Sequence, residues 1–245
     1  MSSAGDGRPL AGRWAVVTGA SRGIGAEVAR RLVREGARVA LVARGVDAME
    51  SLSRELGPDA ATPVACDLSD GTAIDRASRR IMELAGGAPE IIVNNAGAFS
   101  IAPAHETSVD VFRRTLETNV TAPFALIRAF LPAMLARGSG HLVTLGSIAD
   151  RAVFPGNAAY AASKHGVRAL HEVLRAELRG SGVRASLVSP GPVDTELWDE
   201  IDPDNQSGFT PRAQMLTPAD VAEAVRWVVL APATVNVDEL RLSRS

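Results

Sequence analysis

The chain has 245 residues, of which 46% are hydrophobic and 22% charged, which excludes a disordered or fibrous protein and fits one large α/β domain. Its net charge of −2 offers no basic footprint for nucleic acid or for an anionic membrane. The chain has one cysteine, no apolar run of the roughly 20 residues that span a bilayer, and no apolar core near its start, so we expect a cytoplasmic protein.

Beyond a flexible N-terminal arm expected over residues 1–12, short apolar runs alternate with longer amphipathic stretches. The runs predict strands over 14–18, 38–43, 63–66, 90–94, 141–145 and 184–188. The stretches predict helices over 24–35, 46–56, 72–86, 108–136, 158–180 and 218–230. This alternation is typical of a parallel sheet with helices on both faces, and the continuously apolar strands indicate that both faces are buried. We therefore predict a single doubly wound, Rossmann-like α/β domain over residues 13–245.

Residues 191–216 interrupt this rhythm with three prolines, six acidic residues and the aromatic residues Trp198 and Phe209. A structureless segment of this length in a compact domain is usually functional, so we predict a substrate lid. The alternative is a solvated surface insertion.

A glycine-rich turn, Gly19-x-x-x-Gly23-x-Gly25, joins the first predicted strand to the first helix. Glycines there permit a tight turn and close approach of the backbone to a phosphate, and the helix N-terminus offers free N–H groups. The spacing differs from the common G-x-G-x-x-G pattern, so this turn alone leaves a purely structural role open.

The end of the second predicted strand discriminates between dinucleotides. An acidic residue there binds the ribose 2′-hydroxyl of NAD, whereas an arginine accommodates the 2′-phosphate of NADP. This chain has Ala43 followed by Arg44, and Arg22 adds a positive charge in the glycine-rich turn. We predict NADP(H) rather than NAD(H); the alternative is that both arginines are ordinary surface residues.

Tyr160 and Lys164 are the only tyrosine and the only lysine of the chain, and their spacing places them on one helix face. A nearby ammonium lowers the pKa of a phenol from its usual value of about 10, which makes proton exchange useful near neutral pH. Ser147 follows the fifth strand at the sheet edge where ligands gather, so its hydroxyl is placed to hold a carbonyl oxygen. Arginine replaces lysine everywhere else, which indicates that arginine would not serve at position 164.

Jointly, these motifs resemble the short-chain dehydrogenase/reductase family over about residues 10–242. The resemblance rests on Thr18 to Gly25, Asp67, Asn94 to Gly97, Asn119, Ser147, Tyr160 with Lys164, and Pro190-Gly191 leading to Thr195. It implies a seven-stranded parallel sheet and an oxidoreductase in which hydride passes directly between a nicotinamide and a carbonyl carbon, with no metal. The C-terminal segment departs from the family pattern by lacking its glycine pair.

The same resemblance implies a role for each site residue. Tyr160 is the implied general acid or base, Lys164 binds the nicotinamide ribose, and Ser147 orients the substrate oxygen. Asn119 is implied to hold a water that relays protons between Lys164 and solvent, and Asp67 to contact the adenine. The implied cofactor pocket comprises Gly19, Ser21, Arg22, Gly23, Ile24, Gly25, Arg44, Asp67, Leu68, Asn95, Ala96, Gly97, Tyr160, Lys164, Pro190, Gly191, Val193 and Thr195.

Apolar side chains are expected to wall the substrate pocket and to favour a small or medium, mostly apolar ketone, aldehyde or secondary alcohol. The predicted wall residues are Phe99, Ile148, Phe154, Leu197, Trp198 and Met215, with ordinary packing as the alternative for each. The acidic lid predicts weak turnover of polyanionic substrates. The stretches 108–136 and 158–180 are too apolar for one sheet face, and by resemblance they form a homodimer or homotetramer.

Two other functions stay open at this point. The first is an epimerase, dehydratase or lyase on the same scaffold, and the second is a non-catalytic nucleotide-binding regulator. The complete set of Ser147, Tyr160 and Lys164 argues against the regulator, because a pure binder does not need all three. We expect a small-molecule substrate as partner, and neither nucleic acid nor membrane.

Overall fold

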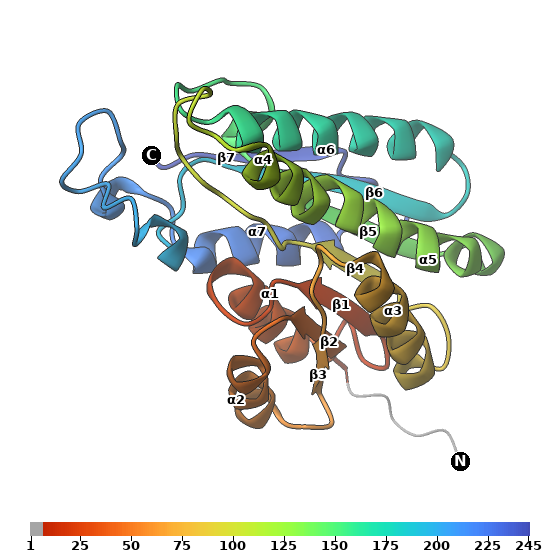
Figure 1. Ribbon diagram of the computed structural model, residues 1–245. Helices are drawn as coiled ribbons and strands as arrows, with labels where there is room; N and C mark the ends of the chain where they lie inside the picture. Colours follow the sequence, from red (N-terminus) through yellow and green to blue (C-terminus); the bar gives the residue numbers. More distant parts are fainter. Residues whose placement is uncertain (1–6) are drawn as a thin grey trace, which may run out of the picture.

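A sheet of seven parallel strands organises the chain, for which the computed structural model describes residues 7–245 (Figure 1). The strands are β1 (Trp14–Thr18), β2 (Arg38–Ala43), β3 (Ala61–Ala65), β4 (Ile91–Asn94), β5 (Gly140–Leu145), β6 (Val183–Pro190) and β7 (Glu239–Leu242). The α-helices are α1 (Gly23–Arg34), α2 (Val46–Leu56), α3 (Gly71–Ala85), α4 (Val109–Leu116), α5 (Ala122–Arg137), α6 (Ala158–Glu177) and α7 (Pro218–Leu230). The predicted fold class is confirmed.

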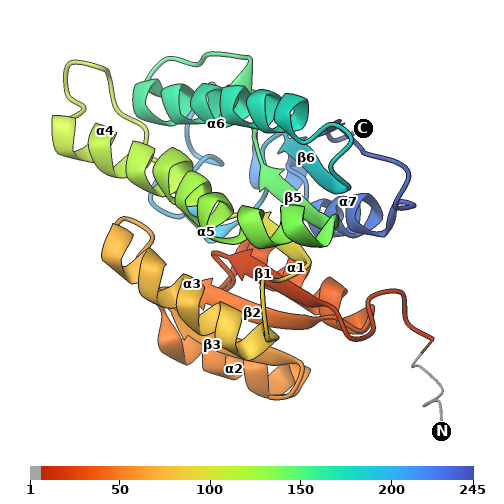
Figure 2. The ribbon, with the colours of Figure 1, turned by 90° about the vertical axis from the view of Figure 1, so that its right-hand side faces the viewer.

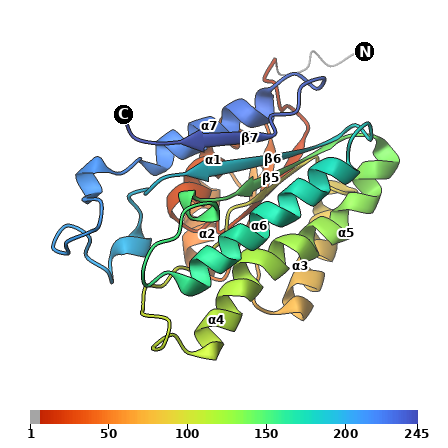
Figure 3. The ribbon, with the colours of Figure 1, turned by 90° about the horizontal axis from the view of Figure 1, so that it is seen from above.

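Helices cover both faces of the sheet (Figure 3). One face packs against α1, α2 and α7, in a core that contains Val17 and Val143. The other face packs against α3, α5 and α6, where Ile81 and Phe130 are fully buried. Val16 and Val17 belong to different cores, because successive strand residues point to opposite faces. Full burial of each such side chain contributes about 1.5–3 kcal/mol, so the sheet forms a firm base for the residues at its edge.

The strand order β3-β2-β1-β4-β5-β6-β7 reverses beside β1. In an open parallel sheet, such a reversal leaves a crevice at the carboxyl ends of the strands, and ligands bind there. Gly19 follows β1, Asn95 follows β4, and Ser147 lies two residues after β5. The topology therefore gathers the predicted cofactor and catalytic residues at one edge of the sheet.

Two predicted boundaries need correction. The flexible arm predicted over 1–12 does not reach Leu10, which is buried and whose N–H donates to the Glu35 carbonyl at 2.8 Å. Residues 1–6 of that arm lie outside the described part of the chain. β3 begins at Ala61, two residues before the predicted start at Pro63. Proline is tolerated inside this strand because β3 lies at the edge of the sheet, where one side has no partner strand.

The helix predicted over 108–136 is α4 and α5 joined by a π-helical turn, Glu117–Thr121, into one continuous helix (Figure 2). By length and composition alone, Val109–Arg137 is long and apolar enough to cross a membrane. Its buried residues Leu126 and Phe130 belong to the core beneath the sheet, so we interpret it as a core helix. The π-helical turn contains Asn119, whose side chain is buried.

Candidate active site

The turn between β1 and α1 brings backbone segments into close contact. Gly19 has a φ of +66°, and a Cβ there would lie 2.9 Å from the Cα of Ala96. A Cβ on Gly25 would overlap the carbonyl oxygen of Gly19. Glycine fits these two positions because it has no Cβ. Within residues 7–245, no side chain caps the first turn of α1, so its N–H groups are available to a phosphate.

Thr18 and Asn95 fasten the ends of β1 and β4 together. Thr18 Oγ1 accepts hydrogen bonds from the backbone N–H groups of Asn95 and Ala96, both at 3.0 Å. Asn95 Nδ2 donates to the Thr18 carbonyl at 2.8 Å. These bonds place the predicted residues Asn95, Ala96 and Gly97 beside the glycine-rich turn, where Ser21 and Ile24 also lie.

Arg22 and Arg44 are exposed at the same end of the sheet, one before α1 and the other after β2. Among the described residues, neither guanidinium has a hydrogen bond or an ion pair. Hydrogen bonds from Ser69 lower the pKa of Asp67, and the charge of Arg44 adds a smaller effect in the same direction. Both arginines therefore keep their donors for an anion, with Asp67 nearby.

The opposite wall of the predicted cofactor pocket comes from the segment after β6. The Gly191 N–H donates to the Leu242 carbonyl on β7 at 2.8 Å, which fixes the chain directly after Pro190. Thr195 Cγ2 lies 3.4 Å from where a Cβ of Gly23 would stand. Both halves of the sheet therefore contribute to the pocket. Leu68 instead packs in the core, which leaves only its backbone for a ligand.

Tyr160 and Lys164 lie one turn apart near the start of α6, as predicted. The Lys164 Nζ lies 5.5 Å from the centroid of the Tyr160 ring and donates to the Leu145 carbonyl at 2.7 Å. The Lys164 side chain is buried, which lowers its pKa to about 8, and the negative charge of Asp150 partly opposes this effect. The lysine is therefore an ammonium at neutral pH, held in a largely water-free place.

The pKa of Tyr160 is raised, in contrast to the prediction that Lys164 would lower it. Burial is the main cause, the charge of Asp150 adds to it, and the hydrogen bond with Ser147 opposes it. Burial disfavours the phenolate, and Lys164 is not among the groups that shift the pKa of Tyr160. The ammonium is also engaged by the carbonyl of Leu145.

Ser147 caps a short 3-10 turn, Ile148–Asp150, just beyond β5. Its Oγ accepts a hydrogen bond from the Ala149 N–H at 3.1 Å, and its hydroxyl lies near enough to the phenol of Tyr160 to lower the pKa of that phenol, against the larger effect of burial. Two groups that are to bind one substrate oxygen must converge in this way. The structure thus brings Ser147, Tyr160 and Lys164 together.

Asn119 uses its whole side chain to join two segments. Its Oδ1 accepts from the Ala98 N–H at 2.7 Å, and its Nδ2 donates to the Ala98 carbonyl at 3.0 Å and to Ser163 Oγ at 2.9 Å. Ser163 Oγ in turn donates to the Tyr160 carbonyl at 2.7 Å. Asn119 therefore fixes the loop after β4 against α6. The predicted relay water stays a prediction.

A row of three aromatic rings extends from Tyr160 into the predicted lid. Phe99 lies edge-on to Tyr160 with the ring centroids 4.8 Å apart, and Trp198 lies 5.2 Å from Phe99. Phe209, which the sequence analysis did not place in the pocket, lies 6.2 Å from Trp198. Trp198 Nε1 donates to the Val193 carbonyl at 3.0 Å, so the lid is anchored beside the predicted nicotinamide wall. This cluster supplies an apolar wall that begins at the Tyr160 ring and continues into the lid.

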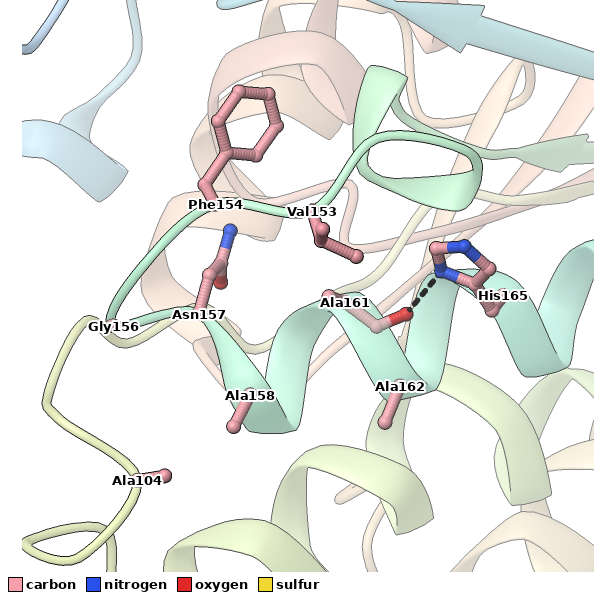
Figure 4. A pocket seen from close by; sticks show the side chains of 9 residues that line it. All are labelled: Ala104, Val153, Phe154, Gly156, Asn157, Ala158, Ala161, Ala162 and His165. Atoms are coloured by element: carbon pink, nitrogen blue, oxygen red, sulfur yellow. Dashed lines mark hydrogen bonds between the residues drawn. The ribbon is translucent and has the colours of Figure 1, made fainter.

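The other predicted wall residues are dispersed. Ile148 lines a cavity of about 280 Å³ together with Gly191 and Pro192. Phe154 lines a separate cavity of about 400 Å³ with Asn157 and His165, among others (Figure 4). Leu197 is 45% exposed, whereas Met215 is fully buried beneath the lid. Phe154 and Met215 therefore do not join the aromatic cluster, since the first lies in another cavity and the second in the core.

One arginine organises the predicted lid, the light blue segment at the left of Figure 1. Arg212 Nη1 donates to Asp194 at 2.7 Å, and its Nη2 donates to Asp199 at 2.5 Å. Its backbone N–H donates to Asp204 at 2.8 Å. Half of the acidic residues noted in the sequence are thus bound by Arg212, which weakens the predicted repulsion of anionic substrates.

Asp150 is a site residue that was not predicted from the sequence. This carboxylate is fully buried, accepts a hydrogen bond from Ser189 Oγ at 2.5 Å, and lies three residues after Ser147. The two residues form a capping box, in which the Ser147 side chain caps the turn and Asp150 faces the Ser147 N–H. The pattern of a serine followed three residues later by an acid was the available signal.

Comparisons with known proteins show the family to which the chain is related. The family model described as short chain dehydrogenase matches residues 13–206. Glycine betaine reductase ATRR of Emericella nidulans is 38% identical over 237 residues, which cover 95% of this chain and 19% of that protein. Dehydrogenase/reductase SDR family member 7B of Bos taurus is 40% identical over 190 residues, which cover 74% of this chain and 58% of that protein.

The chain thus spans less than two thirds of either relative. Among solved structures, a metagenomic short-chain oxidoreductase in complex with NADP is similar at a TM-score of 0.84 and 34% identity, covering 97% of this chain and 99% of that one. With a family model over most of its length and the expected fold, the chain belongs to the short-chain dehydrogenase/reductase family of oxidoreductases, as the description of the matching model indicates.

Proposed function

We propose that this protein is an NADP(H)-dependent oxidoreductase that interconverts a small or medium, mostly apolar ketone or aldehyde and its alcohol. The observation that carries the proposal is the convergence of Ser147, Tyr160 and Lys164 at one edge of the sheet. When bound, the nicotinamide dinucleotide supplies or accepts the hydride.

Each of the three residues has a distinct task. The Ser147 hydroxyl holds the substrate oxygen, and Tyr160 gives that oxygen a proton in reduction or takes one in oxidation. Lys164 uses one N–H for the Leu145 carbonyl, which leaves two donors for the hydroxyls of a ribose. The raised pKa of Tyr160 keeps the phenol protonated at neutral pH, which suits the reductive direction.

The preference for NADP(H) rests on charge. Ala43 stands where an acidic residue would bind the 2′-hydroxyl of NAD, and the unpaired Arg22 and Arg44 flank the same place. A 2′-phosphate is matched by two guanidinium groups with free donors. The NADP bound to the similar metagenomic oxidoreductase supports this assignment.

The apolar substrate class rests on the row of rings Phe99, Trp198 and Phe209, which begins against Tyr160. A homodimer or homotetramer is supported by the exposed side chains of Phe124 on α5 and Val173 on α6, at 50% and 53%. Light scattering that shows a monomer would end the oligomer proposal. The cytoplasmic location stays a prediction.

The function is tested in two steps. Tryptophan fluorescence titrations with NADPH and NADH are expected to show tighter binding of NADPH. Absorbance then follows NADPH consumption with matched neutral and anionic carbonyl compounds, and the neutral apolar ones are expected to be turned over faster. Tight NADPH binding without oxidation on any carbonyl would favour an epimerase, a dehydratase or a regulator instead.

A further inference from the structure

Asp150 is a fully buried carboxylate to which the mechanism above gives no task. Its Oδ2 accepts a hydrogen bond from Ser189 Oγ on β6 at 2.5 Å, and the Ser147 N–H points to the same oxygen at 3.5 Å. Its Oδ1 accepts from Arg151 Nε at 3.1 Å. A buried carboxylate is costly unless it is paired and hydrogen-bonded, and these donors meet that need.

The carboxylate packs directly against the backbone that leads into Ser147. A Cβ on Gly146 would lie 2.7 Å from Asp150 Oδ2, so the carboxylate fills the space beside this glycine. Arg151 extends the network, because its Nη2 forms an ion pair with Glu239 on β7. The position of Ser147 thus depends on a chain of polar contacts that crosses from β5 to β7.

The charge of Asp150 faces the catalytic pair. α6, which carries Tyr160 and Lys164, packs against the Ile148–Asp150 turn. Burial raises the pKa of Tyr160, and the negative charge of Asp150 raises it further. Burial lowers the pKa of Lys164, and the same negative charge opposes that lowering. The other charged groups around Asp150 are Arg151 on the same segment, Glu239 beyond it, and Arg241 and Arg244, which line the adjoining cavity of about 280 Å³. Arg151 is the one of these that touches the carboxylate.

We propose that Asp150 is a positioning residue that holds Ser147 in place and, through its buried charge, sets the protonation states of Tyr160 and Lys164. This inference rests on the proposed function, in which those two residues act on substrate and cofactor. Buried charges interact strongly because solvent and salt screen them little. Asp150 thereby helps Lys164 stay an ammonium despite burial and helps Tyr160 keep its proton.

The chain offers a direct test, because it contains one tyrosine and one lysine. Protein labelled with ¹³C in both residue types gives one side-chain resonance for Tyr160 and one for Lys164, and each can be titrated without turnover. Asp150→Asn keeps the shape and removes the charge, and we expect both pKa values to fall, because a nearby negative charge favours the protonated form of each group. Arg151→Gln removes the positive charge that pairs with the Asp150 carboxylate, and we expect the pKa values of Tyr160 and Lys164 to rise.

Glu172→Gln is the matched control, since it removes a negative charge from the exposed side of the same helix, where Glu172 pairs with Arg168. In Glu172→Gln the pKa values of Tyr160 and Lys164 should stay unchanged, because solvent and salt screen an exposed charge. In turnover assays, the pH profile of alcohol oxidation should move to lower pH in Asp150→Asn and to higher pH in Arg151→Gln.

The proposal is overturned if Asp150→Asn leaves both pKa values unchanged, or if both variants move them in the same direction. If Asp150→Asn fails to fold, Arg151→Gln alone decides by the sign of its shift. A protein that turns over no carbonyl would refute the proposed function, yet its two titrations would still show whether Asp150 controls these groups.

Discussion

Replacing Lys164 with methionine is expected to change stability with opposite signs at low and high pH. Burial lowers the pKa of Lys164 from its usual 10.5 to about 8, so the folded state holds the proton less tightly than the unfolded state. Between these two values the unfolded chain binds more protons, and the free energy of unfolding therefore rises with pH across this window. Below pH 8, the folded protein bears the full cost of burying an ammonium.

The size of the effect follows from the two pKa values. Their difference corresponds to roughly 3 kcal/mol of unfolding free energy below pH 8. The Lys164→Met variant removes this cost, but it also loses the hydrogen bond to the Leu145 carbonyl, worth about 1 kcal/mol. We expect a gain of about 2 kcal/mol at pH 7 and a loss of about 1 kcal/mol above pH 10.5, with turnover abolished at every pH.

Urea unfolding of wild type and Lys164→Met at several pH values, at one protein concentration, measures this difference. Lys164→Arg is the matched control, because arginine keeps its charge throughout and should be less stable than wild type at every pH. A Lys164→Met variant that is less stable than wild type at pH 7, by an amount that does not change with pH, would refute the argument from buried charge.

Three further changes test the cofactor and proton-transfer assignments. Tyr160→Phe should lower kcat by about 10²–10⁴-fold with little change in NADPH affinity, and an unchanged rate would refute the acid–base role. Arg44→Ala should weaken NADPH by about tenfold or more and leave NADH nearly unaffected in fluorescence titrations, and equal losses would contradict the phosphate argument. Gly25→Ala should unfold at lower urea and lose NADPH binding, because the added Cβ overlaps the Gly19 carbonyl. Gly45→Ala, where a Cβ meets nothing within 4 Å, is its control.

The fold was predictable because buried strands and helices have recognisable patterns of apolar residues in the sequence. Strands buried on both faces are apolar at every position, and β1, β2 and α7 lie where the sequence placed them. The burial of Leu10 was not predictable, since a single leucine in a glycine-rich segment forms no helical or strand-like pattern of apolar residues. The π-helical turn was equally hidden, because residues 108–136 are apolar enough to read as one regular helix.

The site was predictable where one residue type does one task, as with Tyr160 and Lys164. It was less predictable where a side chain acts through packing. Phe209 joins the aromatic cluster only because the lid folds back, and that path is set by Arg212 and its three acidic partners. Met215 shows the reverse error, since a residue in a predicted lid can still face the core.

The structure also explains why lysine stands at position 164 in a chain that otherwise uses arginine. The ammonium is buried, donates to the Leu145 carbonyl and lies over the Tyr160 ring. An arginine would bring a larger planar group with five hydrogen-bond donors, more than the Leu145 carbonyl can accept from. It also could not lose its charge. Burial lowers the pKa of Lys164 to about 8, within reach of ordinary proton exchange, whereas a guanidinium stays charged at any pH the protein meets. The lone lysine therefore suits this buried space, and unlike arginine it could take the part in proton transfer that the family resemblance implies.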